Sequence, residues 1–427
     1  MLSPQSAASA ESLNPLDLTS RSGGLHQRLV MEALGEMDAG YLRLQLPDGS
    51  VRHLGTHGHP LGANLNILRP SFFTRVLLYG DVGFGEAYVE GDCETDDIQK
   101  LISWAILNLD KSPAFSGSRT RKLGLNLLQI FNRLRHLLRP NNRVIARRNI
   151  AEHYDLGNEF YQLWLEPTVT YSSARWKDAE LDLEAAQVEK YDALCRRLKL
   201  CPSDHVLEIG SGWGGFASHA VRHYGCRVTT ITISRKQYDF ALERFAREGT
   251  SSRIRLLLQD YRDITGTYDK VVSIEMMEAL GDKYLETYFA KIHEVLAPHG
   301  LVALQYITCP DSRHDQMKRG IDWIQKHIFP GSLLLSIGRV SEATRRTGDL
   351  FLHELEDLGL DYARTLQAWH TAFNSRLEEV QGLGFDARFI RRWNYYLLYC
   401  AAAFAMRNIS VVQAVYTRPN NPLLRGN

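Results

Sequence analysis

The sequence predicts an α/β protein built on a doubly wound, mostly parallel sheet, with a small α+β domain in front of it. Two observations carry this prediction. From about residue 149, apolar strand patterns alternate with helical patterns over short connections, which is typical of a parallel sheet covered by helices on both faces. Residues 206–216 also have the pattern of a strand, a glycine-rich turn and a helix, the unit that holds a nucleotide-like cofactor at the carboxyl end of parallel strands.

The predicted catalytic domain covers residues 149–427. Within it we expect strands at 206–209, 227–232, 255–259, 270–274, 300–306 and 411–415. Helices are expected at 183–198, 214–224, 235–248 and 283–296. The segment 314–371 interrupts the alternation, so we expect it to be an inserted helical cap over the carboxyl edge of the sheet.

The chain in front of this domain divides into three parts. Residues 1–24 are polar and rich in Ser and Ala, which predicts a disordered tail. Residues 25–110 predict the small α+β domain, with a hairpin at 41–54, strands at 65–68 and 85–91, and helices at 71–79 and 97–109. Residues 111–148 form a basic linker.

The basic linker is the exceptional feature of an ordinary composition. The 427 residues are 44% hydrophobic and 23% charged, with a net charge of +1, as in a soluble globular protein of two domains. Between Asp110 and Glu152 there is no acidic residue, and residues 123–138 place leucines, Ile130 and Phe131 along one helical stripe. Ten basic residues occupy this interval: Lys111, Arg119, Arg121, Lys122, Arg133, Arg135, Arg139, Arg143, Arg147 and Arg148.

Two interpretations of the basic linker stay open. Its helix could lie in the headgroup plane of an anionic membrane, or it could pack its apolar stripe against one of the domains. No aromatic interleaving or nucleic-acid-binding fold accompanies the charge, so nucleic acid is not an expected partner.

The remaining bulk features predict a cytoplasmic protein with at most peripheral membrane contact. The six cysteines show no metal-ligand spacing, so no metal site is expected and they are predicted to be reduced thiols. The N-terminus lacks the basic region and apolar core of a secretory signal. The longest uncharged apolar run, residues 395–406, is too short to span a bilayer.

The glycine-rich turn indicates what kind of ligand binds. Gly210, Gly212 and Gly214 remove Cβ atoms that would keep a ligand from the backbone, and the helix behind them presents unpaired N–H groups. The turn lacks the Lys-Ser/Thr ending of a triphosphate-binding P-loop. A dinucleotide, or a purely structural turn, remains an alternative.

Five separated segments together resemble the cyclopropane-fatty-acyl-phospholipid synthases and their mycolic acid methyltransferase relatives. They are HYDLGN at 153–158, the strand and turn at 206–216, SIEMME at 273–278, IQKHIFPG at 324–331 and DYARTLQAW at 361–369. The resemblance covers residues 149–420, and less distinctly the N-terminal unit. It implies a Rossmann-like class I methyltransferase that uses S-adenosylmethionine on the double bond of unsaturated phospholipid acyl chains, and a possible homodimer.

The resemblance also carries cofactor contacts over to this sequence. It implies that Tyr171 and Ser172 cover the sulfonium end, that Thr232 and Ile233 line the ribose and adenine, and that Gln237 binds a ribose hydroxyl. Asp260 and Tyr261 would lie beside the adenine, and the glycine turn of Gly210, Gly212 and Gly214 beneath the cofactor. Taken alone, each has a structural interpretation: Thr232 could satisfy backbone groups only, and Asp260 could cap a turn.

The resemblance further implies a bound bicarbonate as the base that takes a proton from the substrate cation. Its expected ligands are Glu278, Tyr362 and Gln305, with the backbone N–H groups of Ser173 and Ile307. Two of these depart from the family pattern, since Ser173 replaces a Cys and Gln305 replaces a His. A glutamine donates a hydrogen bond but cannot shuttle a proton. The product therefore stays open between a cyclopropane and a methylene- or methyl-branched chain.

Two other functions are compatible with the same residues. One is a methyltransferase that acts on a small soluble molecule such as an amine. The other is a lipid-binding protein with a degenerate site, against which the complete turn, Gln237, Glu278 and Tyr362 argue. The basic linker and the N-terminal unit favour a lipid substrate. Aromatic faces can stabilise a substrate cation, although most of the aromatic candidates are expected to be core: Phe329, Tyr362, Trp369, Tyr395, Tyr396 and Tyr399.

Overall fold

The structure, a computed structural model, describes residues 15–111 and 156–424, with side chains from residue 24 onward. The basic linker, apart from Lys111, and residues 1–14 of the expected tail therefore lie outside the described residues. Residues 15–24, expected to be disordered, instead belong to helix α1 (Pro15–Gly35).

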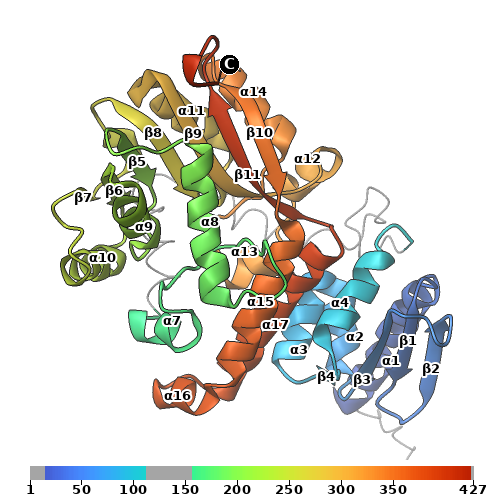
Figure 1. Ribbon diagram of the computed structural model, residues 1–427. Helices are drawn as coiled ribbons and strands as arrows, with labels where there is room; N and C mark the ends of the chain where they lie inside the picture. The colour runs from blue at the N-terminus through green and yellow to red at the C-terminus, as the bar shows by residue number, and fades with distance from the viewer. Residues whose placement is uncertain (1–14, 112–155, 425–427) are drawn as a thin grey trace, which may run out of the picture.

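A seven-stranded sheet forms the centre of the larger part of the molecule (Figure 1). Its order is β10-β11-β9-β8-β5-β6-β7, in which β11 is antiparallel to both of its neighbours and the pairs from β9 to β7 are parallel. The predicted doubly wound, mostly parallel sheet is thus confirmed. The strands are β5 (His205–Ile209), β6 (Arg227–Thr232), β7 (Ile254–Leu258), β8 (Tyr268–Ile274), β9 (Leu296–Thr308), β10 (Phe351–Asp357) and β11 (Ser410–Thr417).

Alternating strand residues feed two separate apolar layers, one on each face of this sheet. Val206 and Val228 pack with helices α8 (Leu183–Arg197), α9 (Gly215–Tyr224) and α10 (Arg235–Arg247). Leu207 and Ile231 face the opposite layer, with α11 (Leu285–Val295) and α14 (Ile337–Thr347). The short helices η1 (Tyr261–Asp263), η2 (Met277–Ala279), η3 (Asp282–Tyr284) and η4 (Pro422–Leu424) follow strands or lie in connections.

The segment expected to be a helical cap is largely helical but also contains strand β10. Its helices are α12 (Asp311–Arg319), α13 (Trp323–His327), α14 and α15 (Gly359–Asn374), and two more follow, α16 (Leu377–Gly382) and α17 (Ala387–Ala405). Strand β10 lies at the sheet edge, where most of its side chains are exposed. A strand exposed on both faces carries no alternation of buried and exposed residues, which is why its sequence did not predict it.

The N-terminal unit has its own four-stranded sheet in the order β2-β1-β3-β4. Strands β1 (Tyr41–Gln45) and β2 (Val51–Gly55) form the predicted hairpin, followed by β3 (Gly62–Ile67) and β4 (Cys93–Glu94). Helices α2 (Ser71–Tyr79) and α4 (Ile98–Leu107) agree with the prediction. The strand expected at 85–91 is wrong, because these residues belong mainly to helix α3 (Asp81–Val89). Tertiary packing explains the difference: the glycines of α3 allow close contact with its neighbours.

One continuous apolar core joins the N-terminal unit to the cap helices. It runs from Leu42 and Phe73 in the N-terminal unit to Trp369 and Trp393 in α15 and α17, and it includes α7 (Asn158–Trp164). In Figure 1, α15 and α17 lie between the N-terminal elements and the seven-stranded sheet. Arg391 of α17 also donates to the carbonyl oxygen of Tyr88 at 2.6 Å. The two parts therefore share a core.

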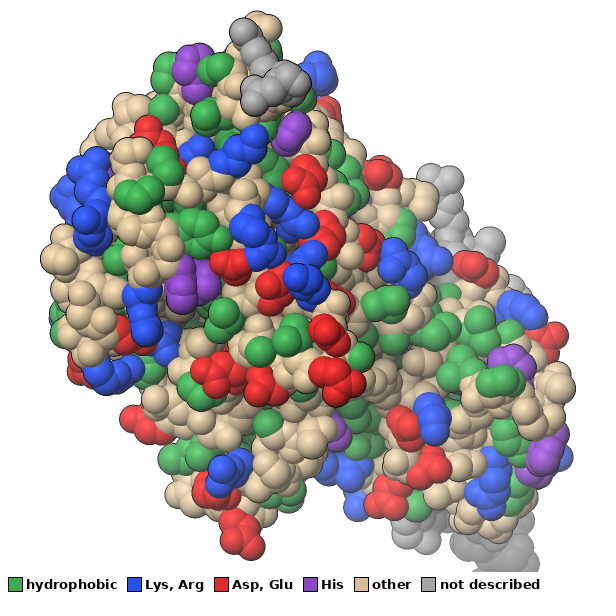
Figure 2. Space-filling view, viewed as in Figure 1, with side chains coloured by type: hydrophobic (Ala, Val, Ile, Leu, Met, Phe, Trp, Pro, Cys, Tyr) green, Lys and Arg blue, Asp and Glu red, His purple; other side chains and the backbone are tan. Residues whose placement is uncertain are grey.

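The described surface offers no segment for crossing a bilayer. Within residues 15–111 and 156–424, no helix combines the length and the apolar character that a membrane span requires. On the face drawn in Figure 2, basic and acidic side chains are interspersed.

The contact between α3 and the cap makes a stability prediction. A Cβ built on Gly85 would lie 2.5 Å from the ring of Trp323, which is 1% exposed. We expect Gly85→Ala to lower the free energy of unfolding by about 1–3 kcal/mol, because the indole cannot move without disturbing the core. Gly35→Ala is the matched control, since nothing lies within 4 Å of its Cβ position. Denaturant unfolding checks both variants, and equal stability of the two would contradict the proposed tight contact.

Candidate functional site

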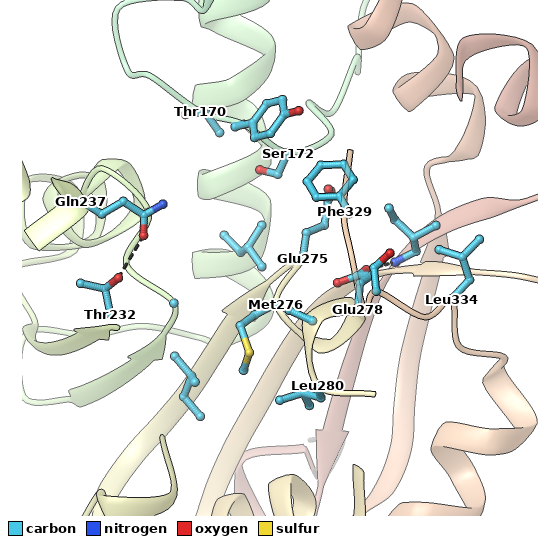
Figure 3. Close-up of a pocket in the computed structure, with 18 of the residues that line it drawn as sticks. Thr170, Ser172, Thr232, Gln237, Glu275, Met276, Glu278, Leu280, Phe329 and Leu334 are labelled. Atoms are coloured by element: carbon cyan, nitrogen blue, oxygen red, sulfur yellow. Dashed lines mark hydrogen bonds between the residues drawn. The ribbon is translucent and has the colours of Figure 1, made fainter. Parts of the chain in front are cut away.

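A cavity of about 380 Å³ opens at the carboxyl ends of β5, β6 and β8 and continues beneath the cap (Figure 3). This is the edge of a doubly wound sheet at which ligands bind. Twelve of the predicted site residues line the cavity, and Gly214, Ser173 and Gln305 do not. The twelve are Tyr171, Ser172, Gly210, Gly212, Thr232, Ile233, Gln237, Asp260, Tyr261, Glu278, Ile307 and Tyr362.

The glycine turn connects β5 to α9 with backbone conformations that favour glycine. Gly210, Gly212 and Gly214 have φ angles of +97°, +49° and +89°. Nothing lies within 4 Å of the Cβ position of Gly212, so the backbone is open to the cavity there. A Cβ on Gly214 would lie 2.7 Å from the ring of Phe245. Gly214 therefore serves the packing of α9 against α10, while Gly210 and Gly212 form the floor of the cavity.

Thr232 and Gln237 form a hydrogen-bonded pair at the end of β6. The Thr232 hydroxyl donates to Oε1 of Gln237 at 2.9 Å, and both side chains are buried (Figure 3). Because Oε1 accepts this bond, the amide nitrogen of Gln237 is left to donate to a ligand. Thr232 also accepts from the backbone N–H of Ser234, so it satisfies a backbone group as well.

Asp260 follows β7 and is held by Arg262. Two hydrogen bonds of 2.7 Å join the guanidinium to the two carboxylate oxygens, and the backbone N–H of Arg262 also donates to Asp260. Asp260 therefore caps the turn that starts η1, as its structural interpretation predicted, and it also lines the cavity beside Tyr261. The neighbouring Arg262 guanidinium lies over the rings of Tyr261 and Tyr284.

The segment 171–174 crosses the cavity between the glycine turn and the cap. The Tyr171 hydroxyl is 2.7 Å from that of Tyr396. The Ser172 hydroxyl accepts from the ammonium group of Lys190 at 2.6 Å. Lys190 is fully buried in α8, and this burial lowers its pKa to about 7 against the opposing effect of Glu275 and Glu166.

Glu275, directly after β8, accepts hydrogen bonds from three separate parts of the chain. Its Oε1 accepts from the backbone N–H of Ser173 at 2.8 Å and from Nε2 of Gln305 at 2.8 Å. Its Oε2 accepts from the Tyr362 hydroxyl at 2.9 Å. Burial raises its pKa, and these three donors together with Lys190 oppose the rise.

The orientation of Gln305 is determined by a chain of hydrogen bonds that starts at Arg197. Arg197 donates to Oε1 of Gln413, and Nε2 of Gln413 donates to Oε1 of Gln305 at 3.0 Å. Nε2 of Gln305 then donates to Glu275. Every donor in the chain points toward Glu275, so the chain stabilises a negative charge there.

Glu278, in η2, has one partnered and one unpartnered carboxylate oxygen. Oε1 accepts from the backbone N–H of Ile307 at 2.5 Å, whereas Oε2 has no hydrogen-bond partner among the described residues. Burial and the nearby Glu275 raise the pKa of Glu278 to about 8. The three donors on Glu275 and the unpartnered Oε2 of Glu278 therefore favour the negative charge on Glu275 and the proton on Glu278.

The residues expected to hold bicarbonate do not fit that ion in this structure. Ser173 N–H, Gln305 and Tyr362 all donate to Glu275, and the Ile307 N–H donates to Glu278. Each expected donor already binds a carboxylate of the protein. A second anion here would need the same donors and would face the negative charge of Glu275.

Aromatic side chains line the part of the cavity under the cap. Phe329, Tyr362, Tyr396 and Tyr399 line it. Trp369 and Tyr395 are fully buried in the core and do not. Aliphatic residues such as Leu366 complete an apolar wall opposite the glycine turn.

Three buried ionisable residues at or near the cavity were not predicted as site residues. Glu275 lies three residues before Glu278, so the motif SIEMME contained its signal. Glu208 is the penultimate residue of β5, and burial raises its pKa to about 8. Lys190 lies within a helical pattern, where nothing in the sequence marks it as buried.

Comparison with known proteins agrees with this geometry. The sequence profile of the mycolic acid cyclopropane synthetase family matches residues 141–414. The tuberculostearic acid methyltransferase UfaA1 of Mycobacterium tuberculosis is 33% identical over 95% of this chain and 93% of its own length. The cyclopropane-fatty-acyl-phospholipid synthase of Escherichia coli is 34% identical over 83% of this chain and 88% of its own.

A solved structure extends the similarity to three dimensions. The mycolic acid cyclopropane synthase CmaA1, complexed with SAH and CTAB, aligns with a TM-score of 0.60 at 29% identity. The alignment covers 64% of this chain and 98% of that one. The chain therefore belongs to the mycolic acid cyclopropane synthetase family and is an S-adenosylmethionine-dependent methyltransferase with a class I α/β fold.

Proposed function

We propose that this enzyme transfers a methyl group from S-adenosylmethionine to the double bond of unsaturated acyl chains in membrane phospholipids. The product is a cyclopropane or a methylene-branched fatty acid, and the latter becomes methyl-branched when a separate reductase follows. The relatives support both outcomes by name, since one is a cyclopropane synthase and another a tuberculostearic acid methyltransferase.

One observation carries this proposal: a single cavity joins the glycine turn to an apolar, aromatic wall and to two carboxylates. The cofactor would lie on Gly210 and Gly212, with Gln237 at its ribose. The order β8-β5-β6 places Glu275 and Glu278 on the opposite side of β5 from Gln237, where the substrate would reach the methyl group.

The chain contributes alignment, exclusion of water and charge rather than a nucleophile. When bound, S-adenosylmethionine supplies an activated methyl group. An alkene is a weak, neutral nucleophile, so the apolar wall must hold it in line and keep water away. The faces of Phe329, Tyr396 and Tyr399 are available to stabilise the cation that forms on the acyl chain.

We propose that the enzyme binds the surface of an anionic membrane. The basic linker suits the anionic surface of a membrane, where each basic residue contributes about 1 kcal/mol. We also propose a cytoplasmic location with peripheral membrane contact, and a homodimer. A small-molecule methyltransferase is the alternative, and the apolar lining of the cavity favours the lipid.

Expression in a host with monounsaturated phospholipids tests the proposed function. We expect new fatty acids heavier than the host's monoenes by one CH₂ group, detected by mass spectrometry, and absent from a host carrying the empty vector. Locating a remaining double bond separates a methylene branch from a cyclopropane ring. If purified protein binds S-adenosylmethionine but the host contains no new acyl species, the small-molecule alternative is favoured.

From the Thr232–Gln237 pair we predict that the amide of Gln237 contacts the cofactor. We expect Gln237→Leu to raise the Kd for S-adenosylmethionine about 3- to 10-fold, the loss that follows from removing one hydrogen bond. Isothermal titration calorimetry measures it. Gln381→Leu, an exposed position on α16, serves as the control and should bind as the wild type does. Unchanged affinity in the Gln237 variant would remove this residue from the cofactor site.

We expect a substitution of Glu278 to lower the activity of the enzyme and to raise its stability. Its pKa is about 8 in the folded protein and near the ordinary 4.5 when unfolded. The folded state thus keeps a proton that the unfolded chain releases, so wild-type stability falls as the pH rises from 4.5 to 8. We expect Glu278→Gln to be more stable than wild type by roughly 2–4 kcal/mol at pH 8.

That advantage should shrink toward zero near pH 4.5, as thermal unfolding across this range will show. Turnover of the same variant should fall about tenfold or more, with cofactor affinity nearly unchanged. Glu378→Gln, at an exposed position, should show neither effect. Full activity of the Glu278 variant would exclude it from the mechanism, and a pH-independent stability difference would contradict its raised pKa.

A further inference from the structure

We propose that the carboxylate of Glu275 is the base of this enzyme and takes the place of a bound bicarbonate. The inference rests on the proposed function, because it concerns the proton lost after methyl transfer to an acyl double bond. Its evidence is the hydrogen bonding, the backbone conformation and the electrostatic surroundings of Glu275.

Glu275 occupies the position that an exchangeable anion would need. The backbone N–H of Ser173, the amide of Gln305 and the hydroxyl of Tyr362 converge on its two oxygens at 2.8–2.9 Å. A carboxylate has about four acceptor positions. These three bonds use two positions on Oε1 and one on Oε2, so Oε2 keeps acceptor capacity for a substrate proton. Glu275 lines the same cavity as the glycine turn, which gives it access to the substrate.

The backbone of Glu275 has a conformation that is unusual for a residue with a side chain. Its φ angle is +48°, in the left-handed region that favours glycine. Its backbone N–H donates to the carbonyl of Gln305 at 2.7 Å, which ties the residue to β9. A glutamate in this conformation costs free energy, and such strain concentrates at functional sites.

The surroundings of Glu275 stabilise its charge in preference to that of its neighbour Glu278. The buried ammonium of Lys190 acts on Glu275, and the chain from Arg197 through Gln413 and Gln305 ends on it. Glu278 has only one hydrogen bond to its carboxyl group and faces the charge of Glu275. Glu275 is thus the member of the pair that is prepared to accept a proton.

This assignment also accounts for Gln305, one of the two residues that depart from the family pattern. Glutamine cannot shuttle a proton, but it does not have to if a carboxylate of the protein accepts it. Its amide instead holds Glu275 in one orientation, with its own oxygen satisfied by Gln413.

The proton transfer balances without a further reactant. Methyl transfer leaves a cation on the acyl chain. For a cyclopropane, a C–H bond of the new methyl group breaks, its proton goes to Oε2 of Glu275, and its electron pair forms the new C–C bond to the cationic carbon. For a methylene branch, a hydride first shifts from the methylated carbon to the cationic carbon. A C–H bond of the methyl group then breaks, its proton goes to Oε2 of Glu275, and its electron pair forms the double bond. After product release the proton returns to water.

The test compares turnover in buffer freed of carbon dioxide with turnover after bicarbonate is added. The assay uses full-length protein, S-adenosylmethionine and vesicles of monounsaturated phosphatidylglycerol. Wild-type turnover should be the same in both buffers. Glu275→Gln, a neutral isostere, should turn over at least about 100-fold more slowly and bind S-adenosylmethionine as tightly as wild type. Glu243→Gln, at an exposed position on α10, is the matched control with normal turnover.

A second variant keeps the test informative if the first one folds poorly. Glu275→Gly suits the left-handed backbone and vacates the space between the three donors. We expect added formate or bicarbonate to restore its turnover at least about tenfold while leaving wild type unaffected, which a purely structural role for Glu275 would not produce.

Two results would overturn the inference while leaving the proposed function in place. One is wild-type activity that is lost without bicarbonate and regained on its addition. The other is Glu275→Gln turnover within tenfold of wild type. If the wild type forms no methylated acyl product in either buffer, the proposed function fails, and this inference fails with it.

Discussion

The desolvation of one half-buried carboxylate, Glu275, is the constraint on which the arrangement of the site depends. Its three donors come from the segment before α8, from β9 and from α15, so one side chain connects the cofactor side, the sheet and the cap. A buried charge is tolerated only with such partners, because an unpaired one costs several kcal/mol. The cap therefore closes over the sheet in a position that keeps these donors together.

The shared apolar core supports the cap in addition to the hydrogen bonds of Glu275. Helix α17 contacts both α4 and α3 of the N-terminal unit, and it also contributes Tyr396 and Tyr399 to the cavity. The N-terminal unit thus stabilises the wall against which we place the acyl chain.

Sequence reasoning predicted the parts of the fold in which local pattern and tertiary environment agree. The central strands, buried on both faces, were found within a few residues of their observed bounds. Strand β10 was missed because its exposed edge position leaves no alternating pattern, and α3 was mistaken for a strand because its glycines and Val89 resemble one. Helix α3 forms because its packing in the apolar core outweighs the low helix propensity of its sequence.

In the site, as in the fold, sequence motifs predicted some of the residues, while the tertiary environment determined the others. Gly210 and Gly212 were predicted from the pattern of strand, turn and helix, whereas Thr232, Gln237 and Glu278 were predicted from the resemblance to the family. All of them line the cavity. The partners of Glu275 could not be predicted, because the contact joins residues 173, 275, 305 and 362, which are far apart in the sequence. Gln305 was recognised only as a substitution, and its function became clear from its hydrogen bonds.

Infrared difference spectroscopy of the two carboxyl groups tests the central claim most directly. Spectra of wild type, Glu275→Gln and Glu278→Gln would be recorded at pH 7 in the absence of substrate. We expect the Glu275 variant to lose an ionised carboxylate band and the Glu278 variant to lose a protonated carboxyl band. The reverse pattern, with Glu275 protonated and Glu278 ionised, would contradict Glu275 as the base prepared in the resting enzyme.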